Sequence, residues 1–350
     1  MCDPLSPSLS WKPRCPEEVH SSRKRKANVT LEDLWRIKPI RPRVELSRPE
    51  RPPEAESDED KVLVVDLFCG CGGFSCGAEQ AGHKVVLAVD CDRAALAYHK
   101  ANHKSCVHAR MVLGPQTEER LLSLIIQHVP EGRKWHLHGS PPCQLFSPMR
   151  NLKKGKNQLM GMELVKWYVE FATRINPHTW TFENVRSPAI REYMTQNQIS
   201  HGYFNFVNYG VPQTRKRCLA GTESIIHTFK SDASLKVETP RTPSDVLQPP
   251  PTAVLIRASG GKNIEYFYRS VDEPTWAILC ACKPVYVAED RRCVRVMHMR
   301  EIMTLQTFPD SYRMKSSGCL GRLGTEADRV RLVGNAIPPM VARKLMSSVK

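Results

Sequence analysis

The segment KVLVVDLFCGCGGFS, residues 61–75, joins an apolar run of strand length to a glycine-rich turn. The nearly continuous apolar run, residues 61–68, is typical of a strand that is buried on both faces of a parallel sheet. The glycines after it allow a backbone to approach a ligand closely. The segment therefore predicts the first strand of a mostly parallel α/β sheet and the turn that leads into its first helix.

A second apolar strand, residues 85–89, follows a short helix-like stretch and ends at Asp90. An acid at the tip of the second strand can hold ribose hydroxyls, so this βαβ pattern predicts a nucleoside cofactor. The pattern does not distinguish NAD from S-adenosylmethionine. The alternative is a tight strand-to-helix turn without a ligand.

Two further side chains stand just after predicted strands. Cys143 follows Pro141 and Pro142, which restrict the backbone and can hold the thiol at a fixed position. Glu183 ends the predicted strand at residues 178–182, where ligands bind in parallel sheets. The alternatives are a buried cysteine in a proline-rich turn and a capping or solvated glutamate.

The net positive charge of the chain comes entirely from residues 61–350. The 350 residues carry a net charge of +15, and residues 1–60 hold 12 basic and 12 acidic side chains. Residues 61–350 therefore hold 39 basic and 24 acidic ones. A basic body favours a polyanionic partner. Residues 1–60 also hold 9 of the 27 prolines, which predicts a mostly disordered extension.

Targeting and metal signals are weak in this sequence. No run of 18 apolar residues and no secretory signal pattern are present, so we expect neither a membrane span nor oxidised cysteines. The cluster Arg23, Lys24, Arg25 and Lys26 resembles a nuclear-localisation signal, or is a solvated tail. The cysteine spacings match no zinc site, so we expect no metal; they are Cys69, Cys71, Cys76, Cys280, Cys282 and Cys293.

Six segments together resemble the DNA (cytosine-5)-methyltransferase family, over roughly residues 61–345. They are DLFCGCGGFS (66–75), SPPCQLFS (140–147), ENV (183–185), GVPQTRKR (210–217), REIMTLQTFPDSY (300–312) and RLVGNAIPP (331–339). Each segment alone is a weak signal, but all six occur in the order of the family.

The resemblance implies a fold and a domain plan. The fold would be that of S-adenosylmethionine-dependent methyltransferases, a Rossmann-like, mostly parallel sheet flanked by helices, with a small, mostly-β target-recognition domain. Residues 61–224 would form the first part of the catalytic and cofactor-binding domain, and residues 225–297 the recognition domain. Residues 298–350 would return to complete the catalytic domain with a C-terminal helix.

The resemblance also implies the catalytic groups. Cytosine carbon 5 is a poor nucleophile until a thiolate adds to carbon 6, and Cys143 matches the family thiolate. Glu183 matches the carboxyl that engages ring nitrogen 3 and the exocyclic amine. Arg215 and Arg217 match an arginine pair near the cytosine oxygen and that glutamate.

S-adenosylmethionine would be the methyl donor. The matching cofactor residues are Phe68, Gly70, Gly72, Asp90, Cys91 and Asn335. The sequence departs from the family at three points. Arg110 stands where an Asp near the adenine amine is usual, Cys91 replaces a larger apolar residue, and His136 and His138 precede the Cys143 segment in place of an acid and aliphatic residues.

The partner implied is double-stranded DNA, bound by a monomer, with one cytosine turned out of the duplex. A basic, glycine-containing loop at residues 150–156 would close on the DNA, unless it is an ordinary solvated loop. The predicted nucleic-acid contacts are Gln144, Ser147, Arg150, Lys153, Lys154 and Lys156. The location would be the nucleus, or the cytoplasm for a microbial protein; the sequence does not identify any recruiting protein.

Two other functions stay open at this point. An RNA-methylating relative would keep the chemistry, although the Cys-Phe-Thr tripeptide of the transfer-RNA branch does not occur here. A catalytically inactive, nucleic-acid-binding regulatory relative would fit the missing Asp. The intact Cys143, Glu183, Arg215 and Arg217 argue against that second alternative.

Overall fold

The computed structural model describes residues 61–142, 154–249, 253–258, 266–279, 284–288, 293–314 and 325–349. The described segments belong to one compact unit within residues 44–350. The extension predicted at residues 1–60 and the basic cluster at residues 23–26 lie outside the described residues.

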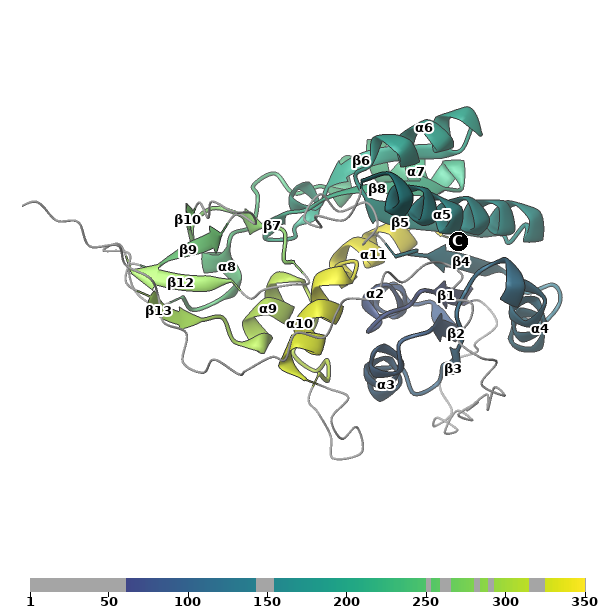
Figure 1. Cartoon of the computed structure of the whole chain (residues 1–350), viewed down its shortest axis with the longest axis horizontal. Coiled ribbons are helices and arrows are strands. Elements are labelled where there is room, and N and C mark those ends of the chain that lie inside the picture. The colour runs from purple at the N-terminus through teal and green to yellow at the C-terminus, as the bar shows by residue number, and fades with distance from the viewer. Residues whose placement is uncertain are drawn as a thin grey trace, which may run out of the picture. The chain divides into compact units, whose positions relative to one another are not determined.

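A seven-stranded sheet organises the larger part of the chain (Figure 1). Its strand order is β3-β2-β1-β4-β5-β8-β6, and β3, β2, β1, β4 and β5 pair in parallel. Strand β8 is antiparallel to both β5 and β6. The predicted mostly parallel sheet is thus confirmed. The strands are β1 (Leu63–Leu67), β2 (Lys84–Asp90), β3 (Val107–Arg110), β4 (Trp135–Gly139), β5 (Thr179–Val185), β6 (Ser200–Asn205) and β8 (Lys216–Gly221).

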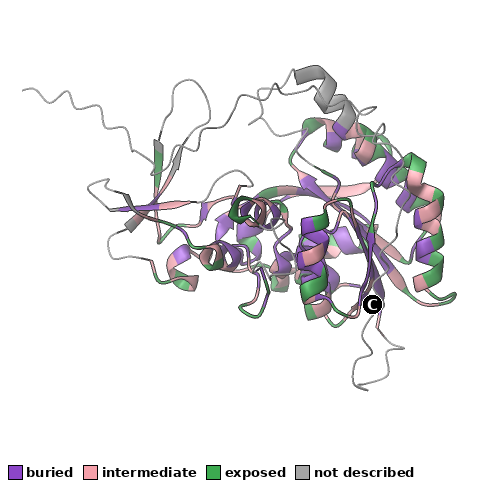
Figure 2. Cartoon of the chain, turned by 60° about the horizontal axis from the view of Figure 1, so that its bottom comes forward, coloured by how far each residue is buried: buried purple, intermediate pink, exposed green. Residues whose placement is uncertain are grey.

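Strand β1 is buried along its whole length because helices cover both faces of the sheet. Its Val64 side chain joins one core cluster with residues of α2 (Gly73–Gln80), α7 (Glu223–Ser231) and α11 (Pro339–Met346). Val65 and Leu67 join the opposite cluster, with residues of α4 (Glu118–His128), α5 (Lys154–Ile175) and α6 (Pro188–Gln196). Figure 2 shows buried residues along the sheet and exposed ones on the outer sides of the helices. The apolar run at residues 61–68 therefore has the burial expected of a central parallel strand.

A separate four-stranded antiparallel sheet, of order β10-β9-β12-β13, lies within the segment predicted to recognise the target (Figure 1). It comprises β9 (Ala253–Ala258), β10 (Tyr266–Ser270), β12 (Val285–Ala288) and β13 (Cys293–Val296). The small, mostly-β part of the fold is thus confirmed. Helix α7, whose residues from 225 onward fall inside the predicted limits 225–297, packs in the core of the large sheet instead. We therefore propose that the small domain starts after Ser231.

The C-terminal segment returns to the large sheet. Helix α11 packs against α2, and a Cβ atom on Gly77 would collide with Pro339 and Ala342. Glycine at that position lets the two helices approach closely. The remaining elements include α3 (Arg93–Asn102), α8 (Pro243–Val246), α9 (Met299–Leu305) and α10 (Glu326–Asn335). They also include β7 (Gln213–Thr214), β11 (Thr275–Trp276) and 3₁₀ turns at Pro115–Thr117, Phe206–Tyr209 and Ala233–Leu235. Among the described residues, no helix is both long and apolar enough to cross a membrane.

Candidate active site

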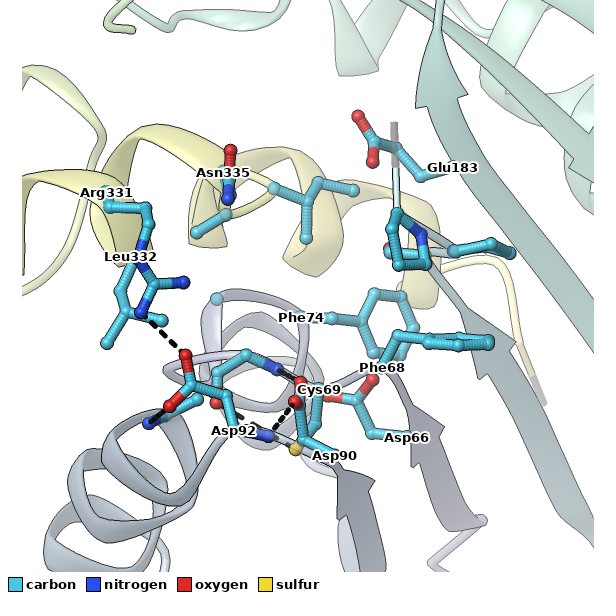
Figure 3. A pocket seen from close by; sticks show the side chains of 18 of the residues that line it. Asp66, Phe68, Cys69, Phe74, Asp90, Asp92, Glu183, Arg331, Leu332 and Asn335 are labelled. Carbon is cyan, nitrogen blue, oxygen red and sulfur yellow. Dashed lines mark hydrogen bonds and ion pairs between the residues drawn. The ribbon is translucent and has the colours of Figure 1, made fainter. Parts of the chain in front are cut away.

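A pocket opens at the carboxyl ends of β1, β2, β4 and β5, where ligands bind in parallel sheets. Its walls include the glycine turn after β1, the end of β2, the prolines after β4, the end of β5 and the last turns of α10. In Figure 3, Glu183 and Asn335 lie on one side of the cavity, and Asp66, Asp90 and Asp92 on the other. Phe68, Gly70, Asp90, Cys91 and Asn335, five of the six predicted cofactor residues, line this pocket.

The turn between β1 and α2 needs left-handed backbone. Phe68 and Gly70 have φ angles of 57° and 55°, and Gly72 one of 91°. A Cβ atom on Gly70 would meet nothing within 4 Å, so this glycine faces open space in the pocket. Gly72 is the sixth predicted cofactor residue, but it is buried and caps α2, and a Cβ there would collide with the Tyr312 hydroxyl. Gly72 thus permits packing behind the turn, and the pocket lining does not include it.

Asp90 holds the glycine turn against the start of α3. Its Oδ2 accepts the Gly70 backbone N–H at 2.8 Å, and its Oδ1 accepts the Asp92 N–H at 2.8 Å. Burial raises the pKa of this carboxyl, while those N–H donors lower it. Each oxygen keeps a lone pair for a ligand hydroxyl. The acid at the tip of β2 is therefore fixed in place and faces the pocket.

Asp92 and Arg331 join the two sides of the pocket, and the sequence did not single them out as a pair. Asp92 caps α3 by accepting the Ala94 N–H, and its other oxygen lies 2.6 Å from Arg331 Nη2 on α10 (Figure 3). The sequence pattern around Asp92, an Asp just before a helical run, indicates only a helix N-cap. The partner is 239 residues further along the chain, so no local pattern identifies it.

Asp66 is a buried acid that also lines the pocket. The Ser75 hydroxyl donates to its Oδ2 at 2.7 Å. Burial raises the pKa of the Asp66 carboxyl to about 7, an effect that the Ser75 hydrogen bond only partly opposes. Within the apolar run of β1, this acid gave no separate signal.

Glu183 and Arg217 face each other where β5 and β8 pair. Arg217 Nε lies 3.0 Å from Glu183 Oε1, and both side chains line the pocket. Burial raises the pKa of the Glu183 carboxyl, and the positive charges of Arg217 and Arg215 oppose this shift. The structure thus brings together the predicted carboxyl and one of the two predicted arginines.

Arg215 lies apart from the pocket lining, deep between segments. Its guanidinium donates to the carbonyl oxygens of Ile278, Gly334 and Ala336 at 3.0–3.2 Å. It therefore ties the residue before β8 to the segment after β11 and to the end of α10. Direct contact of Arg215 with a substrate stays a prediction, and the contacts present are those of a positioning residue.

Two glutamines strengthen the same junction, and sequence reasoning missed both roles. Gln213 Nε2 donates to Gln306 Oε1 at 2.6 Å and to the Leu305 carbonyl, while its Oε1 accepts the Ile278 N–H. Gln306 in turn donates to the carbonyls of Val333 and Ala336. The quoted segments GVPQTRKR and REIMTLQTFPDSY are thus in contact through buried side-chain amides.

Asn184 positions the segment that leads to Cys143. Its Nδ2 donates to the Pro141 carbonyl at 3.0 Å, and Pro141 and Pro142 line the pocket. Cys143 itself lies outside the described residues, as do Gln144, Ser147, Arg150 and Lys153. The loop expected at residues 150–156 is wrong for its last part, because α5 begins at Lys154 and includes Lys156.

The departures from the family pattern have distinct settings. Arg110 is exposed at the end of β3, where its Nε donates to the Cys91 carbonyl at 3.2 Å, and the pocket lining does not include it. His136 and His138 are buried on β4 and share the Thr181 hydroxyl. His138 also contacts Ser140 and stacks on Phe74, with ring centroids 3.5 Å apart. The ring nitrogens of both histidines thus have hydrogen-bond partners within the fold.

Comparisons with known proteins agree with this geometry. The family model of the C-5 cytosine-specific DNA methylase matches residues 62–243 and 256–350. The type II methyltransferase M.AplI of Arthrospira platensis is 25% identical over 325 residues, covering 83% of this chain and 86% of its own length. M.HgiDI of Herpetosiphon aurantiacus is 28% identical over 321 residues, covering 83% and 94%.

Solved structures share the fold at lower identity. A putative DNA modification methyltransferase encoded within a prophage of E. coli has a TM-score of 0.57 and 19% identity, over 83% of this chain and 98% of the other. The S. pombe Dnmt2 methyltransferase has a TM-score of 0.52 and 16% identity, over 82% and 98%.

Proposed function

The chain belongs to the C-5 cytosine-specific DNA methylase family, and on that premise we propose that Cys143 is its catalytic nucleophile. The protein is a DNA (cytosine-5)-methyltransferase that uses S-adenosylmethionine. The proposal concerns the residues that perform this reaction and their roles.

The pocket lining fits S-adenosylmethionine. This cofactor carries a nucleoside and two positively charged groups, and when bound it supplies the methyl group. Asp90 has lone pairs for the ribose hydroxyls, Phe68 offers an aromatic surface, and Gly70 leaves space beside the turn. Asp66 and Asp90 give this side of the pocket carboxyl groups that suit a cation. Asn335, exposed at the end of α10, closes the pocket from the opposite side.

Cys143 would attack carbon 6 of the cytosine as a thiolate, forming a carbon–sulfur bond. The electron pair of the 5,6 double bond then makes carbon 5 nucleophilic, so that carbon 5 can accept a methyl group. Loss of the proton from carbon 5 restores the double bond and expels the thiolate. Asn184 supports this role by holding the backbone carbonyl of Pro141, two residues before Cys143.

Glu183 would stabilise the ring while sulfur adds. Its raised pKa favours the protonated carboxyl, which can donate to ring nitrogen 3 as negative charge develops there. Arg217 fixes the orientation of the carboxyl through the 3.0 Å ion pair and limits the rise of its pKa. Arg215, two residues before Arg217, would hold this part of the chain in place through its hydrogen bonds to three backbone carbonyl oxygens.

One observation carries the proposal: Glu183, Pro142 and Asp90 line a single pocket. Pro142, which directly precedes Cys143 in the sequence, lines the same pocket as Glu183, and this supports a shared role for Cys143 and Glu183. The residues proposed to act on the base therefore adjoin the residues proposed to hold the cofactor, as methyl transfer between the two requires.

The DNA contacts are proposed on charge and exposure. Gln144, Ser147, Arg150, Lys153, Lys154 and Lys156 follow the nucleophile and would contact the strand that carries the target base. In the small domain, Phe267 and Tyr268 on β10 are 47% and 40% exposed, which suits contact with DNA bases or sugars. We further propose that the enzyme acts as a monomer. Nuclear placement stays a prediction from residues 23–26.

Bisulfite sequencing of DNA from cells that express the protein tests the function and reads the target sequence together. We expect new 5-methylcytosine in a defined sequence context with the wild-type chain, and none with Cys143→Ala at equal protein level. Equal methylation by the two proteins would contradict the assignment of Cys143.

A further inference from the structure

Three potential metal ligands meet in the core, apart from the residues that line the pocket. His99 lies on α3, and Cys106 and His108 lie just before and on β3. One nitrogen of each histidine and the Cys106 sulfur lie within 4.8 Å of one another, and all three residues are buried. His99 Nδ1 and His108 Nε2 are 2.8 Å apart.

A hydrogen-bond chain orients His99 toward this cluster. When Asp66 is ionised, Ser75 Oγ donates to it, and His99 Nε2, 3.0 Å from the same hydroxyl oxygen, then donates its N–H to Ser75. A neutral imidazole has one N–H, and therefore the lone pair of His99 lies on Nδ1, the atom that faces His108. A carboxylate that orients a ligand histidine from behind is the usual outer support of metal sites. Here Ser75 transmits that support from Asp66.

The charges around the cluster also suit a metal. The carboxyl groups of Asp66 and Glu79 lie close enough to Cys106 for their charges to act on it. The same two carboxyl groups would stabilise a cation at the cluster.

We propose that His99, Cys106 and His108 bind a zinc ion. Two imidazoles and one thiolate are a preferred zinc donor set, with ligand atoms about 3.3–3.8 Å apart in a tetrahedral site. His99 Nδ1 and His108 Nε2 are 2.8 Å apart and the three ligand atoms lie within 4.8 Å of one another, so the cluster is compact enough for one ion once the side chains adjust. On binding, the thiol loses its proton to solvent, and one zinc–sulfur and two zinc–nitrogen bonds form without any redox change. The three side chains leave the fourth position for a water molecule.

The ion would brace the back of the cofactor pocket. It would join α3 to β3, and through His99 and Ser75 it would connect to Asp66, which lines the pocket. Ser75 lies on α2, directly after the glycine turn. Zinc would therefore stabilise the fold around the turn and leave the pocket itself to the cofactor.

Metal titration of the full chain tests this site without any activity assay. After removal of metals with a chelator, the wild-type protein should bind one equivalent of Zn²⁺ in competition with a chromophoric chelator. With Co²⁺ in place of zinc, it should show a thiolate-to-cobalt charge-transfer band. Cys106→Ser should lose that band and the tight binding. Ser75→Ala should keep the ligands but weaken zinc binding by about 10- to 100-fold.

Cys218→Ser is the matched control, because Cys218 is another buried free thiol and lies outside the cluster. It should bind zinc like the wild-type chain. Failure of the wild-type protein to bind Zn²⁺ or Co²⁺ would overturn the proposal without recourse to any variant. Full binding by Cys106→Ser would also overturn it, since the metal would then lie elsewhere, such as at Cys280, Cys282 and Cys293.

Discussion

Arg217 Nε lies 3.0 Å from Glu183 Oε1, across the antiparallel pair formed by β8 and β5. The register places Arg217 opposite Val185, two residues from Glu183, so both side chains are on the same side of the sheet. Burial favours the protonated carboxyl, and the guanidinium favours the ionised one. The balance between these two effects sets the proton affinity of the group proposed to act on the cytosine ring.

Glu183→Gln should remove the proton donor and keep the shape of the side chain. We expect single-turnover methyl transfer to slow by about 100- to 10,000-fold, the usual contribution of general acid–base catalysis. Cofactor affinity, measured by calorimetry, should change little. Glu223→Gln, an exposed glutamate at the start of α7, is the control. Equal slowing in both variants, or an unaffected rate in Glu183→Gln, would contradict the role of Glu183.

Arg217→Gln should shift the alkaline limb of the pH–rate profile. Because Arg217 lowers the pKa of Glu183, its removal should raise that pKa and keep the carboxyl protonated to higher pH. The fall in rate at alkaline pH should then begin at a higher pH than in the wild type. Arg217→Lys, which retains the cation, should stay closer to the wild-type profile. A shift to lower pH in Arg217→Gln would be inconsistent with this coupling.

Arg215→Met should act on stability. The change leaves three buried carbonyls without their charged donor, and we expect the free energy of unfolding to fall by about 3 kcal/mol. Urea denaturation measures this loss. Arg191→Met, at an exposed position of α6, should cost far less. If the two variants were equally stable, the three hydrogen bonds of Arg215 would not hold the junction together.

Asp66 should make stability depend on pH. Its folded-state pKa of about 7 exceeds its ordinary value of 3.8, so the native state keeps a proton that the unfolded chain releases. This contribution is fully present below about pH 4 and is lost as the pH rises through 7. Asp66→Asn should remove it, and the variant should lose less stability than the wild type between pH 4 and 7. Parallel stability curves for the two proteins would contradict the raised pKa.

Local sequence patterns predicted those parts of the site whose position depends only on neighbouring residues in the chain. The apolar run of β1, the glycine turn and Asp90 occupy positions fixed by one βαβ unit, and the sequence specifies them within about 30 residues. Glu183 follows the same logic at the end of β5. In these cases the side-chain position depends on strand ends, which hydrophobic patterns indicate well.

The remaining features depend on contacts between distant segments. Arg215 and Arg217 belong to the same motif, but their positions differ. Arg217 lies on β8 and faces the pocket, whereas Arg215 lies just before β8 and is buried against Ile278 and Gly334. The Gln213–Gln306 pair joins residues 93 positions apart. No periodicity or motif determines which carbonyl or amide a buried side chain meets, because that depends on how the two domains pack.

The most direct test of the account is covalent trapping on a duplex that contains 5-fluorocytosine at the target position. Fluorine at carbon 5 cannot leave as a proton does, so the adduct between Cys143 and carbon 6 should persist after methyl transfer. Denaturing electrophoresis and peptide mass spectrometry should find DNA attached to Cys143 only when S-adenosylmethionine is present. An adduct on another residue, or an equal yield from Cys143→Ala, would contradict the assignment of the nucleophile.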